Sequence, residues 1–537
     1  MRSIRALQYG IILLGLVSTK GSIARAQQVS SDVPTIQVTS RLVFLDVTVL
    51  DKKGRPVVNG LTKDDFTITD DKKPQRIFSF EAPETHVVDA NTTDDDSAGN
   101  APVTIFVLDL LNSKFEDFAY IRYMVRKYLS AQPAQLSSPA ELMVLENESL
   151  EMVQGYTRSK ADLLYALDHV PPVLPYKEMN RSYTDERFYQ SIDALEQIAL
   201  QNKGVRGRKN IVWVGHGGPN ISTIGIGLPP ETVASLYKYV HEATNMLVDS
   251  RVSLFVIYPG LKVDAPFIMT SALDASVAIG DDDPFSGDIN FGVLVNETGG
   301  NLFYNRNDID TEIKQSEELG SKYYTLTYQP PSDADADGKF RRIRVTLRDP
   351  NLHVVTKAGY FSLDKNAVTG PWQQMMVNLS EAARSSIPFE SLWVTLEHFV
   401  RHPDTGTAEF TVLIGARNLD WQPADDGKSS LDLFLAAASL SESRDVLASK
   451  LEEVPATANN QDATRLAKTE VRLPMKIRIP GKTQSVRVVI ETASNGRTGT
   501  IELDRKTIDG TPSVPTPEPT LILRRRKLSS PESSPTP

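Results

Sequence analysis

The sequence predicts an α/β protein with a doubly wound, mostly parallel central sheet, flanked by an N-terminal and a C-terminal β-sandwich. Two observations carry this prediction. Between residues 103 and 330, continuous apolar runs alternate with segments in which apolar residues recur every three or four positions; these are the patterns of buried parallel strands and of amphipathic helices. On either side, short runs of alternating polarity are separated by Gly, Asn and Asp turns, which is typical of antiparallel sandwiches.

Residues 1–26 have the organisation of a signal peptide. Arg2 and Arg5 precede an apolar run at residues 9–18, and Ala24 and Ala26 supply the small side chains of a cleavage site. The apolar run is too short to cross the ~30 Å hydrocarbon core comfortably; an uncleaved anchor or a buried helix is the alternative. We therefore expect an exported, soluble protein, periplasmic or extracellular, with no stable membrane insertion after cleavage.

Composition narrows the classes of function. The 537 residues include no cysteine, which excludes disulfides, thiol nucleophiles and thiolate metal sites. Loss of residues 1–26 removes four basic residues and no acidic one, so the formal charge falls from −10 to −14. Such a charge does not favour nucleic acid or an anionic membrane as a partner.

Residues 35–82 are predicted to form the small N-terminal β-sandwich. Residues 36–50 alternate apolar and polar side chains with the period of a strand, and turn residues separate the shorter strands that follow. Residues 83–102 are acidic and rich in turn formers, so we expect them to be a linker.

Residues 103–330 are predicted to form the central domain, because strands that alternate with helices build parallel sheets covered on both faces. A hairpin is expected from residues 142–145 and 151–154. Buried strands are expected at residues 103–108, 210–214, 252–258, 301–304 and 323–328, and helices at 115–129, 186–200, 231–249, 291–298 and 308–319.

Four segments complete the chain. Residues 331–362 are expected to be a β extension of the central domain, and residues 363–390 a connector with a Pro-led helical patch. Residues 391–508 contain six short strands and predict the C-terminal β-sandwich. Residues 509–537 are rich in Pro, Ser and Thr and are expected to be disordered; their basic run at 521–527 is either solvated tail or a docking segment.

Four phrases between residues 35 and 362 resemble a known family. They are LVFLDVTVLDKKGRPVVNGLTKDDFTI from residue 42, VTIFVLDLLN from residue 103, FEDFAYIR from residue 115 and IVWVGHGGP from residue 211. Together they resemble the von Willebrand factor A (VWA) domain, and more closely the VWFA-related domain proteins abundant in Acidobacteria. The resemblance implies a doubly wound domain, export, and binding of a ligand or partner.

The VWA resemblance also implies a metal-ion-dependent adhesion site at the carboxyl ends of the strands, here in degenerate form. Asp109 stands at the position of the family's first Asp, Leu111 replaces the first Ser, and Ser113 or its neighbour Asn112 supplies the next oxygen. Thr184, with Thr157 as the alternative, stands for the Thr ligand, and His216 replaces the second Asp. Such a set would hold Mg²⁺ or Mn²⁺ weakly. The alternatives are that Asp109 and Ser113 cap the following helix, or that the site binds a ligand without metal.

Gly217 and Gly218 follow His216 directly after a predicted strand. An HGG turn occurs in the oxyanion-hole loop of α/β-hydrolases, but such enzymes also need a G-x-S-x-G nucleophile elbow, which this sequence lacks. We therefore interpret the two glycines as part of a ligand-binding turn and expect no enzymatic activity.

The sequence thus favours an exported, non-enzymatic binding or adhesion-type protein. Its VWA-like domain would engage a protein or surface ligand outside the cytoplasm. The alternative is a structural scaffold component of a cell-envelope complex whose metal site is vestigial.

Overall fold

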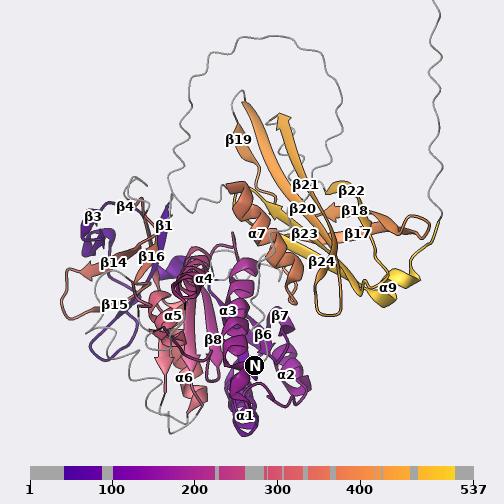
Figure 1. Cartoon of the computed structure of the whole chain (residues 1–537). Coiled ribbons are helices and arrows are strands. Elements are labelled where there is room, and N and C mark those ends of the chain that lie inside the picture. Colours follow the sequence, from indigo (N-terminus) through magenta and orange to yellow (C-terminus); the bar gives the residue numbers. More distant parts are fainter. Residues whose placement is uncertain are drawn as a thin grey trace, which may run out of the picture. The chain divides into compact units, whose positions relative to one another are not determined.

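The computed structural model (Figure 1) describes most of the chain from residue 42 to residue 514. The predicted signal peptide, most of the 83–102 linker and most of the 509–537 tail lie outside the described residues. Among the residues it describes, no helix has the length and apolar character needed to cross a bilayer. The described ranges are 42–87, 101–223, 229–259, 283–286, 288–304, 308–330, 337–362, 371–416, 418–424, 427–459 and 470–514.

A six-stranded sheet forms the central domain, with strand order β12-β10-β8-β5-β6-β7. Neighbouring strands are parallel except at β7, which pairs antiparallel with β6 at one edge. The three central strands are buried along their whole length, which explains their largely apolar sequences. The strands are β5 (Val103–Asp109), β6 (Gln135–Leu145), β7 (Leu150–Ser159), β8 (Lys209–Val214), β10 (Val252–Ile257) and β12 (Asn301–Phe303).

Helices cover both faces of this sheet, as the prediction of a doubly wound fold requires. Successive residues of β5 point to opposite faces: Ile105 packs in a core with residues of α3, α4 and α5, and Phe106 in a second core with residues of α1, α2 and α6. The helices are α1 (Phe115–Ala131), α2 (Lys160–His169), α3 (Thr184–Gln201), α4 (Pro230–Asp249), α5 (Phe291–Glu297) and α6 (Ile309–Ser321). Of these, only α2 was not predicted.

The N-terminal strands share two four-stranded sheets with strands that follow the central domain. The sheet orders are β15-β1-β13-β4 and β16-β14-β2-β3, so the segments expected as a separate sandwich (35–82) and as an extension (331–362) interleave. Their strands are β1 (Val43–Leu50), β2 (Phe66–Asp70), β3 (Lys73–Gln75), β4 (Ile77–Glu81), β13 (Tyr324–Tyr328), β14 (Phe340–Leu347), β15 (His353–Val355) and β16 (Gly359–Phe361).

The prediction that residues 323–328 close the parallel sheet is wrong. β13 pairs antiparallel with β1 on one side and with β4 on the other, and Tyr328 donates a hydrogen bond to Asp70 at 2.7 Å. β13 reads YTLTY, in which Thr alternates with Tyr or Leu, and all five residues are buried. The prediction failed because it followed the alternation of strands and helices along the chain, which does not show which strands pair.

The C-terminal segment forms two antiparallel sheets, as predicted. One has the order β17-β18-β22; the other has the order β19-β20-β23-β24, with β21 also paired to β20. The short strand β19, the long strand β21 and the short helix α9 were not predicted. The elements are α7 (Pro371–Arg384), β17 (Val394–His402), β18 (Thr407–Ile414), β19 (Gln422–Ala424), β20 (Lys428–Leu440), β21 (Val446–Asn459), β22 (Val471–Arg478), β23 (Ser485–Thr492), β24 (Thr498–Asp504) and α9 (Arg505–Gly510).

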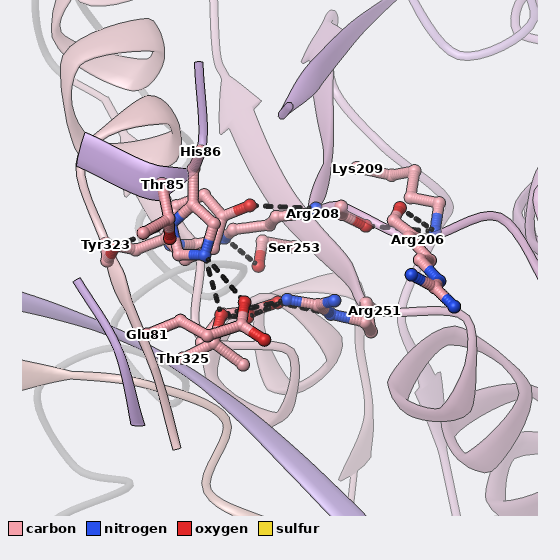
Figure 2. Close-up of polar contacts among 12 residues, drawn as sticks. Glu81, Thr85, His86, Arg206, Arg208, Lys209, Arg251, Ser253, Tyr323 and Thr325 are labelled. Carbon is pink, nitrogen blue, oxygen red and sulfur yellow. Dashed lines mark hydrogen bonds and ion pairs between the residues drawn. The ribbon is translucent and has the colours of Figure 1, made fainter. Parts of the chain in front are cut away.

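A buried guanidinium connects the amino edge of the central sheet to the N-terminal strands (Figure 2). Arg208 precedes β8 and is 1% exposed. Its Nε donates to Ser253 Oγ at 2.8 Å, and its two Nη groups donate to Thr48 Oγ1 at 2.9 Å and to the Gly299 carbonyl at 3.1 Å. The acceptors belong to β10, to β1 and to the segment before β12, so one side chain holds three separate parts of the chain.

An ion pair lies beside this guanidinium. Arg251 donates to both carboxylate oxygens of Asp46, through Nε at 3.1 Å and through Nη2. Burial raises the pKa of Asp46, but the charge and hydrogen bonds of Arg251 outweigh it and hold that pKa at about 2. Figure 2 shows His86 close by, stacked on Tyr323 with ring centroids 4.2 Å apart. The N-terminal strands are therefore fixed to the central sheet by buried charge as well as by apolar packing.

A buried carboxyl group on β6 predicts a dependence of stability on pH. Glu141 is fully buried, its Oε2 accepts from Gln201 at 3.2 Å, and burial raises its pKa from 4.5 to about 8. Because the folded-state pKa lies above the unfolded one, the free energy of unfolding falls as the pH rises from about 4.5 to about 8. Glu141→Gln should remove much of this slope and be more stable than the wild type near pH 8.5, by about 1–3 kcal/mol.

Urea unfolding at about pH 5, 7 and 8.5 measures this difference. Glu116→Gln is the control, because Glu116 is exposed on α1. Equal slopes for Glu141→Gln and the wild type would contradict the prediction.

Candidate functional site

The candidate site lies at the carboxyl edge of the central sheet. β5 ends at Asp109 and α1 begins at Phe115, so the intervening turn stands directly above the strand. The backbone N–H groups of Leu110 and Leu111 both donate to the carbonyl of Leu145, the last residue of β6. The turn after β8 lies beside it, because a Cβ added to Gly215 would come within 2.3 Å of the Asp109 Cβ. The ends of β5, β6 and β8 therefore meet here, as expected for an open α/β sheet.

Asp109 is the centre of a hydrogen-bond network. Its side chain is 1% exposed. Oδ2 accepts from Trp213 Nε1 and from the backbone N–H of Gly217, both at 2.9 Å. Oδ1 accepts from the backbone N–H of Asn112 at 2.9 Å and from Asn112 Nδ2 at 3.0 Å. Burial raises the pKa of this carboxyl, and the Trp213 and Asn112 hydrogen bonds oppose that effect.

Asn112 connects Asp109 to helix α3. Its Nδ2 also donates to Ser191 Oγ at 3.0 Å, and its Oδ1 accepts from Arg187 Nε at 3.1 Å. Ser191 in turn donates to the Arg187 carbonyl at 2.7 Å. The first turns of α3 are thereby tied to the end of β5, which brings a guanidinium to the candidate site.

The other residues predicted as ligands near Asp109 differ in their surroundings. Leu111 is buried in the apolar core. Ser113 is 1% exposed, and its Oγ has no hydrogen-bond partner among the described residues. His216 turns away: its Nε2 lies 3.3 Å from Asp117 Oδ2 on α1, and its ring stacks on Tyr258 at 4.3 Å.

The two threonines are engaged elsewhere. Thr184 is the first residue of α3 and donates to the Arg181 carbonyl at 2.8 Å. Thr157 lies on β7, where its Oγ1 accepts from the Ser159 backbone N–H at 3.0 Å. The alternative that Ser113 caps α1 is not supported either, since the N-cap is Lys114 and makes no side-chain capping bond.

The donor set around Asp109 does not fit a divalent cation. A metal ion needs oxygen lone pairs directed at it, whereas both Asp109 oxygens already accept N–H groups of Trp213, Gly217 and Asn112. Within the described ranges, no group of three or more His, Cys, Asp or Glu side chains has a metal-binding arrangement. In the described structure, protein N–H donors thus occupy the carboxylate around which the Mg²⁺ or Mn²⁺ site was predicted.

The glycines after His216 are explained by packing. Gly217 has φ +72°, a conformation that favours glycine, and an added Cβ would lie 2.8 Å from the Phe291 ring. At Gly218 an added Cβ would lie 2.9 Å from the Ser191 Cβ. The Gly217 N–H is directed at Asp109, so neither glycine is shown to form a cradle for a ligand.

A loop beside this site was not predicted from the sequence. Residues 171–183, which we call the edge loop, join α2 to α3. A buried lysine holds the loop in place: Lys177 Nζ donates to Glu186 Oε1 at 2.7 Å and to the Asn147 carbonyl. Asn147 Nδ2 donates back to the Leu174 carbonyl at 2.8 Å. A single buried lysine in an irregular segment is a weak sequence signal, and its partners lie 9 and 30 residues away.

Large apolar side chains are exposed at this edge. Three belong to the edge loop: Leu174 is 58% exposed, Tyr176 42% and Met179 68%. Phe115, which opens α1 directly after the Asp109 turn, is 50% exposed. We call the three edge-loop residues the apolar patch. Exposed apolar groups on a well-held backbone are typical of binding surfaces.

Comparisons with known proteins add likenesses of fold only. No family model matches the chain, and no curated protein sequence matches it. Among solved structures, the VWA domain of SpRpn10 is similar at 15% identity, with 31% of this chain and 78% of that domain covered and a TM-score of 0.17. Manganese-loaded TRAP protein of Plasmodium vivax is similar at 10% identity, with 67% of this chain and 95% of that chain covered and a TM-score of 0.23.

A third likeness is to the pilus adhesin SpaC of Lactobacillus rhamnosus GG. Its identity is 10%, the coverage is 73% of this chain and 53% of that chain, and the TM-score is 0.25. This chain therefore spans about half of the adhesin's length. TM-scores of this size establish no shared function, and the VWA-like fold of the central domain is shown by its own strand order. The narrower resemblance to the Acidobacteria proteins stays a prediction.

Proposed function

We propose that this protein is an exported, non-enzymatic binding protein whose VWA-like domain engages a protein ligand at the carboxyl edge of the central sheet. The observation that carries the proposal is the apolar patch on the edge loop. Lys177 and Asn147 hold the loop's backbone, while Leu174, Tyr176 and Met179 remain exposed.

A pre-organised loop supports binding because little conformational entropy is lost when a partner covers it. Aromatic and Met side chains contribute large apolar contact areas, and Tyr176 also has a hydroxyl that donates to Glu148. Burial of Met179 and Leu174 by a partner would remove apolar surface from water at about 25 cal/mol per Å². These properties favour a protein ligand over a small polar one.

Export is the second part of the proposal, and it depends on residues 1–26. The basic start, the short apolar run and the small residues before position 27 support it. The alternative is a scaffold in a cell-envelope complex, in which the sandwich strands and not the edge loop would make the contacts.

Site-specific photo-crosslinking in the producing cells tests both parts. A benzophenone amino acid in place of Met179 should give a crosslinked partner, whereas the same probe at Phe78 on β4 or at Trp393 before β17 should not. Those controls are similarly exposed, at 53% and 55%, but belong to other sheets. Crosslinks from Phe78 or Trp393 alone would favour the scaffold. N-terminal sequencing of the recovered protein should begin at Gln27; a start at Met1 would contradict cleavage of the signal peptide and favour the uncleaved anchor.

A further inference from the structure

We infer that Arg187 is the ligand-binding cation at the carboxyl edge and that it takes a carboxylate group of the partner. This inference rests on the proposed function and specifies the chemistry of that same site. It assigns to a protein side chain the positive charge that a metal ion would otherwise supply.

Arg187 is held through one of its three nitrogen atoms. Its Nε donates to Asn112 Oδ1 at 3.1 Å, and Asn112 is fixed by Asp109. Among the described residues, no hydrogen bond or ion pair uses the two Nη groups of Arg187. The hydrogen bond to Asn112 therefore orients the guanidinium. The two Nη groups are left for an acceptor on another molecule. A planar fork of this kind matches both oxygens of a carboxylate.

The charge of Arg187 is only partly balanced within the protein. The side chain is half-buried; burial lowers its pKa, and the charges of Asp109 and Glu178 raise it. Neither carboxylate forms an ion pair with it within 4.0 Å in the described chain, and Asp109 is occupied by other donors. A partly desolvated cation without a direct counterion gains more from an incoming anion than an exposed one does.

The surroundings favour a singly charged carboxylate over a phosphate. The Gly217 N–H, a backbone donor that could help to hold a phosphate, is already directed at Asp109. Exposed carboxylates of Glu148, Asp185 and Glu186 lie on the segments that border the edge loop and open α3. Such charges repel a dianion more strongly than a monoanion. An acidic side chain among apolar ones on the partner would fit both Arg187 and the apolar patch.

NMR titration of the full-length protein tests this assignment. The probes are N-acetyl-glutamate amide, the neutral N-acetyl-glutamine amide, and inorganic phosphate, all at matched ionic strength. The reporters are the Arg187 Nε–H signal and the Trp213 indole N–H, which Asp109 and Asn112 connect to Arg187. Arg187→Lys is the test variant, and Arg181→Lys is the control because Arg181 is exposed three residues before α3.

The glutamate amide should shift both signals saturably, with a dissociation constant on the order of 1–10 mM, and the glutamine amide should bind at least about tenfold more weakly. The Trp213 response should be lost in Arg187→Lys and kept in Arg181→Lys. Three outcomes would overturn the inference: no saturable shift in the wild type, an unchanged response in Arg187→Lys, or saturation by phosphate alone. The wild-type titration does not depend on the stability of either variant.

The two proposals can fail separately. If crosslinking from Met179 persists while the glutamate amide produces no saturable shift, the edge loop still binds a partner but Arg187 is not its carboxylate receptor. If the titration succeeds and Met179 gives no crosslink, the cation site stands and the apolar patch is not the contact surface.

Discussion

Replacing Arg208 with alanine is expected to lower the free energy of unfolding by about 3–5 kcal/mol. The substitution removes hydrogen bonds to Thr48, Ser253 and the Gly299 carbonyl from a side chain that is 1% exposed. It leaves those acceptors buried and opens a cavity at the amino edge of the sheet, and both effects are costly. Urea unfolding followed by far-ultraviolet circular dichroism measures the change.

Arg206→Ala is the matched control for this prediction. Arg206 lies two residues away in Figure 2 but is exposed, so its loss should change stability by less than about 0.5 kcal/mol. If Arg208→Ala changed the free energy of unfolding as little as Arg206→Ala, the buried network would not hold the N-terminal strands to the sheet.

The second large effect is expected at Asp109. Asp109→Ala should lower the free energy of unfolding by about 2–4 kcal/mol, because it leaves the Trp213 indole N–H and the N–H groups of Gly217 and Asn112 buried without an acceptor. The loss should be equal in EDTA and in Mg²⁺, Mn²⁺, Ca²⁺ or Zn²⁺, since none of these donors can coordinate a cation.

The Ser113→Ala variant tests whether Asp109 acts only in the hydrogen-bond network or also belongs to a metal site. Ser113 Oγ is buried without a hydrogen-bond partner among the described residues, so its removal should change stability by less than about 1 kcal/mol. A metal site would lose a ligand in both variants. A melting temperature that rises with one cation in the wild type but not in Asp109→Ala or Ser113→Ala would restore the adhesion-site hypothesis.

Much of the fold could be predicted because the decisive signals are local. The apolar runs at β5, β8 and β10 and the three- to four-residue periodicity of α1, α3 and α4 each lie within one short stretch of sequence. α2 was missed because it is only ten residues long and follows β7 directly. β21 carries partly exposed side chains at nearly every position, so it lacks the alternation that identifies a strand.

The position of the candidate site could be predicted from the sequence, but most of the residues that interact there could not. The Asp109 turn was predicted to lie at the carboxyl edge, where the structure places it. Trp213, Arg187 and Lys177 were not predicted as participants, because their partners are separated from them by up to 104 residues in the sequence. A Trp on a buried strand and an Arg in a helix have many possible partners, and the sequence alone does not choose among them.

The sequence by itself determined the α/β class, the order of most strands and helices, and the place of the Asp109 turn, because each depends on residues close together in the chain. Only the tertiary structure decided that β13 joins β1 and β4, and that Asp109 accepts hydrogen bonds from Trp213 and Gly217. The physical reason is that a strand's partners and a carboxylate's donors are set by which distant backbone and side-chain groups the packed core brings within about 3 Å, and no local pattern records those distances.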